Sequence, residues 1–174
     1  MDEVVLRAIA PGDVDALQEL VESDPGYTER ITGYPPGASD AQSLLMMRPE
    51  GLPEESKVVL GAFAADRLVA VVDVLRGFPN DHTAFIGLLE VHAKYQGLGC
   101  GGTTYGLVER YVGSTWREIR TLRLAVVDTN AQVATGFWER QGFEPTGEER
   151  PYRYDKLESV ARLYEKPLPQ ESGS

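Results

Sequence analysis

Apolar and polar residues recur along the chain with the spacings of strands and helices. Residues 4–9 alternate and predict a first strand, and apolar positions three and four apart predict an amphipathic helix at 13–23. The sequence Asp24-Pro25-Gly26 ends that helix. Residues 27–56 are irregular and rich in proline and glycine, with one helical piece at about 38–47. A stretch of this kind inside a compact domain is typical of a binding loop or lid.

The rest of the chain predicts strands first, and then strands that alternate with helices. Strands are expected at 57–64, 67–75 and 83–91, and the two residues Ala65-Asp66 favour a tight hairpin between the first two. They are followed by a glycine-rich loop at 92–102, a helix at 103–112, a strand at 122–127, a helix at 130–140, and strands at 143–148 and 160–166. An antiparallel meander followed by this alternation predicts a mixed α+β architecture of packed layers.

Composition narrows the class of protein. The 174 residues, 42% of them apolar, suit one folded domain. No apolar run approaches the ~20 residues of a membrane span, and the acidic start of the chain is unlike a secretory signal. The single cysteine, Cys100, cannot form an internal disulfide, and no Cys/His cluster has metal-ligand spacing. We therefore expect a cytoplasmic protein with no metal site and no membrane partner.

The net charge of −10 is unevenly placed. Residues 1–56 hold 12 acidic and three basic side chains, whereas the other 118 residues have a net charge of −1. This balance argues against a nucleic-acid partner, because phosphate neutralisation needs basic patches. The acidic segment is either a solvated surface that keeps the protein soluble or a functional feature.

Four glycines at positions 97, 99, 101 and 102 lie between a predicted strand and a predicted helix. Backbone amides at a helix N-terminus attract anions, so the loop favours a phosphate-bearing ligand over a turn that only packs the strand on the helix. A P-loop is excluded because no Gly-Lys-Ser/Thr follows. Gly97-x-Gly99-x-x-Gly102 does fit a dinucleotide fingerprint, with Asp128 as its ribose-binding acid. However, the loop lies in mid-chain after a meander, and the 46 residues that follow Asp128 are too few for the remaining strands and a substrate domain.

A third interpretation explains more of the sequence. Gln96-x-x-Gly99-x-Gly101 resembles the Q/R-x-x-G-x-G/A loop of the GNAT superfamily of acyl-CoA-dependent N-acetyltransferases. Residues 130–143 are similar to the family's second motif, N-x-x-A-x-x-x-F-Y-x-x-x-G-F, and 162–168 resemble its closing strand. The resemblance implies an α+β fold with about seven mostly antiparallel strands, splayed central strands and helices on both faces. It also implies one domain at 1–168, followed by a flexible tail at 169–174.

The resemblance implies acetyl-CoA, or coenzyme A, as cofactor. Loop amides would hold the pyrophosphate, and backbone groups beside the splay would pair with the pantetheine arm. Asn130 matches an asparagine that reaches the cofactor, and Phe137 and Trp138 would line the slot for the arm, although Phe137 equally suits the core. The expected cofactor-binding residues are Leu89, Val91, Gln96, Gly97, Leu98, Gly99, Cys100, Gly101, Gly102, Asn130, Phe137 and Trp138.

The family transfers the acyl group directly to an amine, without an acyl-enzyme. Glu90 is the leading candidate base, because it lies on the strand that enters the loop, with its side chain expected to face away from those of its neighbours. Trp138 occupies the position of the family's acid, a tyrosine, and an indole N–H is no useful proton donor. Tyr152, two other tyrosines or water would then protonate the leaving thiolate. The remaining candidates are His92, Asp73 and Asp128 as bases, Tyr105 and Tyr154 as acids, and Cys100 as a packing residue in preference to a nucleophile.

The acceptor is the least determined part of the prediction. Tyr27 and Tyr34 are expected wall residues of its pocket, and an acidic rim from residues 1–56 would concentrate a cationic amine. We therefore expect acetyl transfer to the primary amine of a small cationic molecule. A protein or peptide acceptor, a non-catalytic acyl-CoA binding module and a dinucleotide-binding domain stay open as alternatives. A homodimer is possible, although no residue selects an interface.

Overall fold

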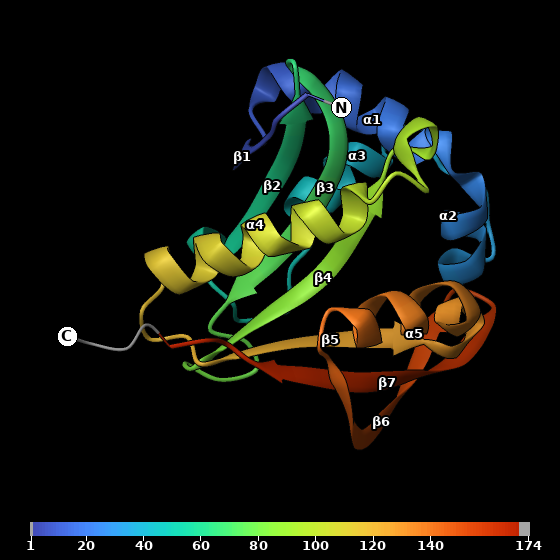
Figure 1. Cartoon of the computed structure of the whole chain (residues 1–174). Coiled ribbons are helices and arrows are strands. Elements are labelled where there is room, and N and C mark those ends of the chain that lie inside the picture. The colour runs from blue at the N-terminus through green and yellow to red at the C-terminus, as the bar shows by residue number, and fades with distance from the viewer. Residues whose placement is uncertain (1, 171–174) are drawn as a thin grey trace.

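The computed structural model describes residues 2–170 and has one seven-stranded mixed sheet with helices on both faces (Figure 1). The strands follow the order β1-β2-β3-β4-β5-β7-β6. They are β1 Val4–Ala8, β2 Lys57–Ala64, β3 Arg67–Arg76, β4 Thr83–Val91, β5 Thr121–Val127, β6 Glu144–Tyr154 and β7 Leu157–Pro167. The helices are α1 Val14–Ser23, α2 Pro25–Thr32, α3 Asp40–Met46, α4 Cys100–Thr115 and α5 Ala131–Arg140.

Five of the neighbouring strand pairs are antiparallel, and β4 with β5 is the parallel one. The hairpin from β2 to β3 turns at Ala65 and Asp66, whose φ angles of 48° and 64° suit a two-residue turn that follows the twist of the strands. The α+β fold with mostly antiparallel strands is therefore confirmed, and so is this hairpin.

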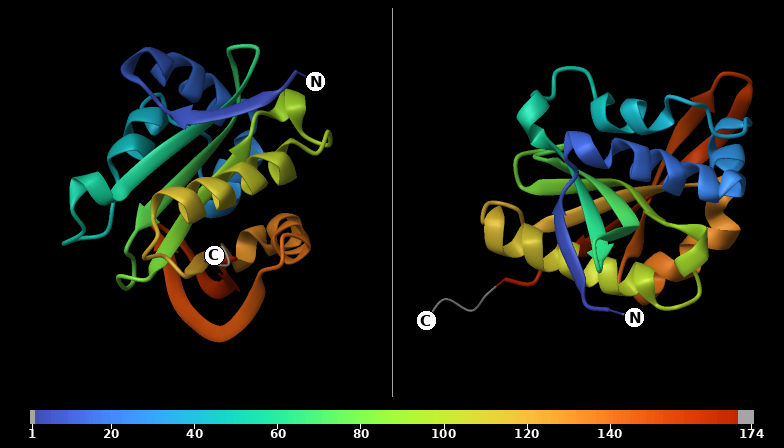
Figure 2. Two further views of the ribbon diagram at one scale, coloured as in Figure 1. Left: turned by 60° about the vertical axis from the view of Figure 1, so that its left-hand side comes forward. Right: turned by 90° about the horizontal axis from the view of Figure 1, so that it is seen from above.

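Helices cover the two faces of the sheet separately (Figure 2). On one face, Val108 and Val112 of α4 pack against Val72 and Val74 of β3, in a core that also takes in the end of α5. On the other face, α1 and α3 cover the sheet through a second core, in which Leu17 is fully buried. Alternate residues of β3 therefore serve opposite cores, as the period of a strand requires.

The two central strands separate after four residue pairs. Thr83–Ile86 of β4 pairs with Thr121–Leu124 of β5, and both strands then continue without pairing to each other. Figure 1 shows them diverging toward the side of the molecule where α2 lies. This is the splay that the family resemblance implies, and it leaves main-chain groups of both strands without a partner strand.

A β-bulge also alters β4 on its other side. Asp73 of β3 pairs with Leu88, whereas the next residue, Val74, pairs with Ile86, so Gly87 is the extra residue. Asp73 lies at the bulge with its carboxylate 3.0 Å from Nζ of Lys57, and both side chains are largely buried. The bulge changes the side of the sheet to which the last part of β4 presents each side chain.

The structure differs from the sequence prediction in three places. Pro25 does not continue an irregular stretch but begins α2, since proline suits the first helical position, where no intrahelical N–H bond is needed. Helix α4 begins at Cys100 instead of residue 103, so two glycines lie in its first turn. Strands β6 and β7 extend to a hairpin at residues 155–156, well beyond the predicted 143–148 and 160–166.

Two further sequence predictions concern the ends of the chain and membranes. Within residues 2–170, no helix is both long and apolar enough to cross a membrane. The tail predicted at 169–174 lies outside the described residues from 171 onward, and the single-domain bounds of 1–168 stay a prediction.

Candidate active site

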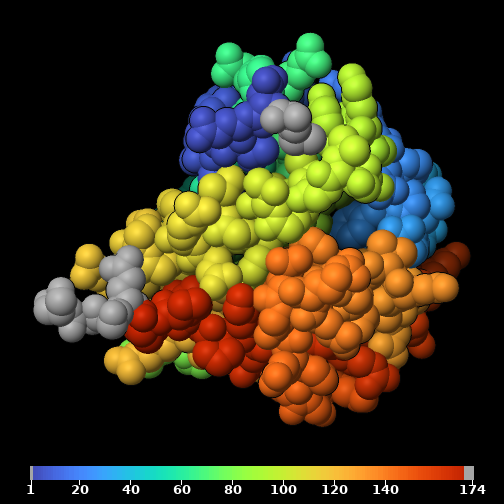
Figure 3. All heavy atoms as spheres, in the orientation of Figure 1, coloured from blue at the N-terminus to red at the C-terminus, as the bar shows by residue number. Residues whose placement is uncertain are grey.

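A cavity of about 700 Å³ opens where β4 and β5 diverge. Its walls are the last residues of the two strands, helix α2, the glycine loop and α5. The space-filling view shows the hollow between α4 and α5, with α2 at its side (Figure 3). Main-chain groups left unpaired by the splay lie along this cavity, at Gly87–Val91 on one side and at 125–127 on the other. An extended, amide-bearing ligand can therefore pair with them as an added strand would.

The glycine loop forms one end of the cavity. Gly97 and Gly99 have φ angles of +78° and +79°, and a Cβ on either would meet nothing within 4 Å. The first intrahelical bond of α4 runs from the amide of Thr103 to the carbonyl of Gly99, at 3.1 Å. The amides of the first turn precede it and have no intrahelical acceptor, so they form an anion site. The loop therefore fits a phosphate group without requiring a basic side chain.

The side chains of the loop play different parts. Gln96 turns back and donates to Asp24 Oδ2 and to the carbonyl of Val91, both at 3.0 Å, which ties the loop to the end of α1. Leu98 is 65% exposed and does not line the cavity. Cys100 is buried, and burial raises the pKa of its thiol, which argues against a nucleophile. Gly101 admits the ring of Phe137, which would lie 3.1 Å from a Cβ there.

Glu90 is a buried carboxyl group in the wall of the cavity. Its side chain is 5% exposed, and its Oε1 has no hydrogen-bond partner among the described residues. Burial raises the pKa of Glu90 from 4.5 to about 8, with smaller contributions from the charges of Asp24 and Asp40. Leu89 packs toward the α4 core, whereas Leu88 packs toward the α1 and α3 core, so Glu90 faces the α1 and α3 side. This is the alternation expected from the sequence.

Helix α2 closes the open end of the splay. Asp24 precedes it, and Tyr27, Arg30 and Ile31 line the cavity from its exposed turns. The phenol of Tyr27 has a raised pKa, first because of burial and next because of the charge of Glu90, and both residues line the cavity. Of these α2 residues, sequence reasoning found only Tyr27. The missed signal was Asp24-Pro25, which suits the start of a helix as well as the end of one.

Comparison with known families identifies the chain. A sequence model of the acetyltransferase (GNAT) family matches residues 16–143, which is more than half of the protein. The chain belongs to the GNAT acetyltransferase family. It is therefore an acetyl-CoA-dependent N-acetyltransferase, which leaves no place for the dinucleotide-binding alternative.

Solved structures of other acetyltransferases share this fold. An acetyltransferase from Thermus thermophilus has a TM-score of 0.69 and 22% identity, over 95% of this chain and 97% of that chain. Spermidine N-acetyltransferase from Vibrio cholerae, in complex with CoA and spermine, has a TM-score of 0.73 and 16% identity, over 95% of both chains. The ribosomal-protein-S18-alanine N-acetyltransferase from Escherichia coli has a TM-score of 0.67 and 17% identity, over 99% of this chain and 97% of that chain. A comparison with curated proteins finds no match.

In this GNAT protein, Trp138 is a core residue as well as a wall of the cavity. It is 8% exposed, and its ring meets those of Tyr105, Phe137 and Phe143 edge to face. Tyr105 lies behind it, fully inside the core, and does not line the cavity. Trp138 has no hydroxyl, and the Tyr105 hydroxyl does not reach the cavity, so neither residue can donate a phenolic proton to a ligand there.

Tyr152, the candidate acid, reaches the cavity from β6. Its hydroxyl donates to the carbonyl of Ile31 at 2.6 Å, and burial raises its pKa. The proton of this phenol is therefore already engaged by the main chain. Tyr152 joins the β6–β7 hairpin to α2 across 121 residues of sequence and so holds α2 in place at the rim of the site.

Several other candidates lie outside the cavity. Tyr34 and Tyr154 are both about half exposed, and the Tyr34 hydroxyl donates to Asp155 at the β6–β7 turn. The Nε2 atom of His92 lies 3.6 Å from the Glu19 carboxylate. The other two candidate bases are held in ion pairs, Asp73 with Lys57 and Asp128 with Arg162. The structure thus brings Tyr27 and Glu90 together but leaves Tyr34 at a distance.

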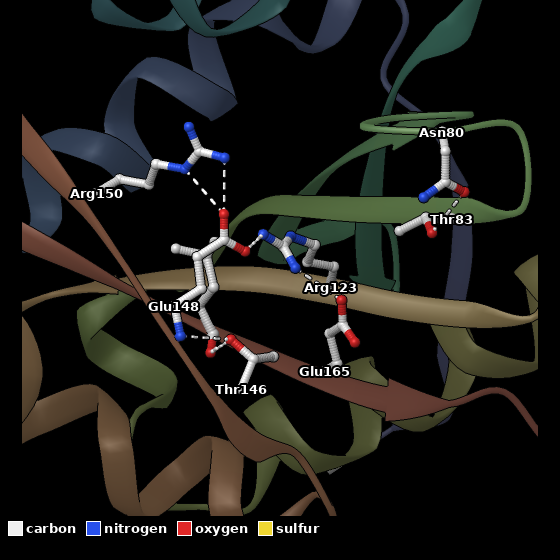
Figure 4. Close-up of polar contacts among 8 residues, drawn as sticks. Asn80, Thr83, Arg123, Thr146, Glu148, Arg150 and Glu165 are labelled. Atoms are coloured by element: carbon white, nitrogen blue, oxygen red, sulfur yellow. Dashed lines mark hydrogen bonds and ion pairs between the residues drawn. The ribbon is translucent and has the colours of Figure 1, made fainter.

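An ion-pair network fixes the strand that carries Tyr152. Arg123 of β5 donates to Glu165 of β7 at 2.7 Å and also to Glu148, which in turn accepts from Arg150 (Figure 4). The network spans the irregular part of β6 between Pro145 and Glu149, where the strand pairing is interrupted. Side-chain bonds therefore replace the missing ladder bonds before β6 reaches the cavity.

Proposed function

We propose that this protein moves an acetyl group from acetyl-CoA to the primary amine of a small cationic molecule by direct attack. The observation that carries this proposal is the buried carboxyl of Glu90, whose Oε1 has no hydrogen-bond partner among residues 2–170, in a cavity whose other end is an anion site. A long anionic thioester and a protonated amine are the two reactants that such a cavity suits. Acetyl transfer is the activity of the family, and the proposal adds the class of acceptor.

The residues present fit acetyl-CoA. The open space at Gly97 and Gly99 admits a phosphate close to the main chain, and the first-turn amides of α4 would hold the pyrophosphate. Main-chain groups of Leu89 and Val91 border the splay, although the Val91 carbonyl already accepts from Gln96. Acetyl-CoA supplies the activated thioester, and the chain's own task is to orient it against the amine.

Glu90 would act as the general base. An acceptor amine arrives as an ammonium ion and must lose a proton before its nitrogen can attack. A carboxyl with a pKa of about 8 is matched to that transfer near neutral pH, since the ideal base has a pKa near the working pH. The proton passes to Glu90, the nitrogen–carbon bond forms, and the carbon–sulfur bond breaks.

The leaving thiolate would take its proton from water. Trp138 stands where the family has its tyrosine, and the Tyr152 proton is engaged by Ile31. A thiol with an ordinary pKa of about 8.5 leaves without much help from an acid. No acyl-enzyme is needed, which agrees with the burial and the raised thiol pKa of Cys100.

Charge supports a cationic acceptor. Asp24 lines the cavity, Glu90 adds a second negative charge there once it has lost its proton, and residues 1–56, which include α1, α2 and α3, have a net charge of −9. A surface of one sign concentrates ligands of the other. The named relatives act on a polyamine in one case and on a ribosomal protein in another, so we infer the acceptor from this chain's own residues. A homodimer and a cytoplasmic location stay predictions.

Thiol release from acetyl-CoA across a panel of amines tests the proposal. Glu90→Gln should lower kcat/KM by at least about 10²-fold and remove the rise in rate that ends near pH 8, because a lost general base costs 10²–10⁴-fold. Glu158→Gln, which removes an exposed carboxyl of β7, is the matched control. It should keep the wild-type kcat/KM and the wild-type rise in rate with pH. Coenzyme A binding without thiol release from any amine would contradict the proposal and support a non-catalytic acyl-CoA binding module.

A further inference from the structure

Arg30 is a cation in the cavity wall that lacks an anionic partner. It is half-buried on α2, and it forms no ion pair with any residue between 2 and 170. Its Nε donates to Asn130 Oδ1 at 2.7 Å, and no hydrogen bond to a described residue involves its two Nη groups. A guanidinium has five N–H donors in a planar fork, so four remain for a ligand.

The position of Arg30 is fixed from three sides. Its carbonyl accepts from the Thr129 hydroxyl at 2.5 Å, and the next carbonyl, that of Ile31, accepts from Tyr152. One turn earlier on α2, the absence of a side chain at Gly26 makes room for the guanidinium, since a Cβ there would lie 3.0 Å from Nη1. The chain therefore holds this guanidinium in place without giving it an ion pair among residues 2–170.

The cofactor phosphates lie elsewhere in the proposed arrangement. Arg30 is bound to Asn130, where α5 begins, whereas the anion loop meets the other end of that helix through Phe137 and Gln141. A helix rises about 1.5 Å per residue, so the two ends of α5 are roughly 15 Å apart. An anion bound by Arg30 would therefore be a different group from the pyrophosphate at the loop.

The anion belongs instead beside the amine. Tyr27 lies one turn before Arg30 on the same helix and borders Glu90 across the cavity. Asp24, at the start of that helix, accepts a hydrogen bond from Gln96 through its Oδ2. Its Oδ1 and Nη1 of Arg30 both lie beside Gly26, 3.5 and 3.0 Å from the point where a Cβ there would begin, and the two side chains form no ion pair among the described residues. The wall formed by α2 thus carries one negative group, Asp24, at its start and one positive group, Arg30, where it meets Asn130.

We propose that the acceptor carries a carboxylate as well as its amine, with Arg30 binding the carboxylate while Glu90 faces the ammonium group. This inference rests on the proposed function and narrows its substrate class to small amino acids and close analogues. Amino acids with a second amine fit best, because they keep the net positive charge that the acidic surroundings favour. The planar fork of arginine matches a carboxylate through two parallel hydrogen bonds, which a lysine cannot reproduce.

Matched acceptors test the inference. Each amino acid in the panel is compared with its carboxamide and with the amine that lacks the carboxyl group. A second series, in which one to four methylene groups separate amine and carboxylate, measures the spacing. We expect kcat/KM for the carboxylate form to exceed that for the carboxamide by about 10²-fold, because truncating one side of a buried charged pair costs this much or more. We also expect a single optimum of spacing.

Substitutions assign the preference to its residue. Arg30→Gln should raise KM for the carboxylate acceptor by about 30-fold or more, leave the carboxamide unchanged and leave the KM for acetyl-CoA unchanged, while Arg30→Lys restores part of the difference. Arg110→Gln, at an exposed position of α4, is the control. The melting temperature of each variant shows whether the loss of the Asn130 bond has unfolded the protein.

Three outcomes would decide against the inference or its basis. Equal rates for the carboxylate and carboxamide acceptors in the wild type would overturn the inference. An Arg30→Gln variant that loses affinity for coenzyme A would also overturn it, because that result would assign Arg30 to the cofactor. Calorimetric titration of amino acids into the coenzyme A complex gives a readout that does not need turnover. If amino acids bind there through Arg30 but no amine is acetylated, the proposed function fails while Arg30 keeps its ligand.

Discussion

A carboxylate oxygen of Asp73 occupies the space where a side chain at Gly87 would begin. A Cβ at Gly87 would lie 2.9 Å from Asp73 Oδ2, and the same oxygen is 3.0 Å from Lys57 Nζ. The β-bulge at Gly87 and the buried ion pair are therefore one structural unit. It supports β4 just before the strand reaches Glu90.

Replacing Gly87 should destabilise the protein. Gly87→Ala would push Asp73 away from Lys57, and we expect a loss of about 1–3 kcal/mol in the free energy of unfolding, measured by urea denaturation. Gly106→Ala is the control, because its Cβ would meet nothing within 4 Å in the middle of α4. That change should stabilise the protein by about 0.5–1 kcal/mol. Equal effects of the two substitutions would contradict the role given to the bulge.

Glu90 should make stability fall as the pH rises. Its pKa is about 8 in the folded protein against an ordinary 4.5, so between these values the native state keeps a proton that the unfolded chain has released. Unfolding then becomes easier as pH increases through this window. The melting temperature of Glu90→Gln relative to the wild type should therefore rise from pH 5 to pH 8 and then level off. A difference that stays constant over this range would show that Glu90 titrates normally.

The glycine at position 99 should matter for cofactor binding. It caps α4 with a φ angle of +79°, and an alanine in this conformation costs about 1–2 kcal/mol. We expect the free loop of Gly99→Ala to relax from this conformation and to regain it on binding, which should raise the Kd for coenzyme A by about tenfold, measured by calorimetry, since 1.4 kcal/mol corresponds to that factor. Gly12→Ala, in open space and without a positive φ, should bind as the wild type does. Unchanged affinity in Gly99→Ala would place the phosphates elsewhere.

Tyr152 should behave as an anchor for α2 and not as an acid. Tyr152→Phe removes its bond to the Ile31 carbonyl, and we expect a loss of about 0.5–1.5 kcal/mol of stability with a raised KM for the acceptor. The value of kcat should stay within about threefold, because general acid catalysis contributes 10² or more when it operates. A fall in kcat of that larger size, with KM unchanged, would instead identify Tyr152 as the proton donor.

Trp138 should contribute to packing and to the cavity wall but not to proton transfer. In Trp138→Phe, the smaller ring leaves a gap between Tyr105 and Phe143, which we expect to cost about 1–2 kcal/mol in a denaturant titration. Turnover with a good acceptor should change little, because an indole N–H donates no proton. A drop in kcat that is larger at high pH would be evidence that the indole stabilises the leaving group.

Local patterns allowed much of this fold to be predicted. The three apolar strand segments between residues 57 and 91 and the two-residue turn at Ala65-Asp66 depend on neighbours in sequence, and the structure has them as expected. The same holds for the glycine loop, because its chemistry is that of a helix N-terminus. The side of the sheet that Glu90 faces followed from its alternation with Leu89, but its burial did not, because burial depends on the distant segments that pack there.

The acceptor side could not be predicted in the same way. Helix α2 is held by contacts between Arg30 and Asn130 and between Ile31 and Tyr152, which are about 100 residues or more apart in the chain. Its Pro25-Gly26 start is also a typical helix stop, so local reasoning chose wrongly. Arg30 carries no motif, and only its position on α2 and its unpaired Nη groups single it out. Tyr34 was predicted as a wall residue because the family builds its acceptor pocket from the first helices and their loop, whereas its hydroxyl binds the distant Asp155.

The divergence of β4 from β5 has a consequence for how this family can change. In the arrangement proposed here, the seat of the cofactor arm is made by main-chain atoms, which every amino acid possesses. Substitutions along the two strands can therefore accumulate without removing a single contact atom from that seat. Structures at 22%, 17% and 16% identity still share this fold over at least 95% of the chain. Side chains at the splay can therefore differ between proteins with different acceptors, while the main-chain atoms that would bind the acyl donor stay the same.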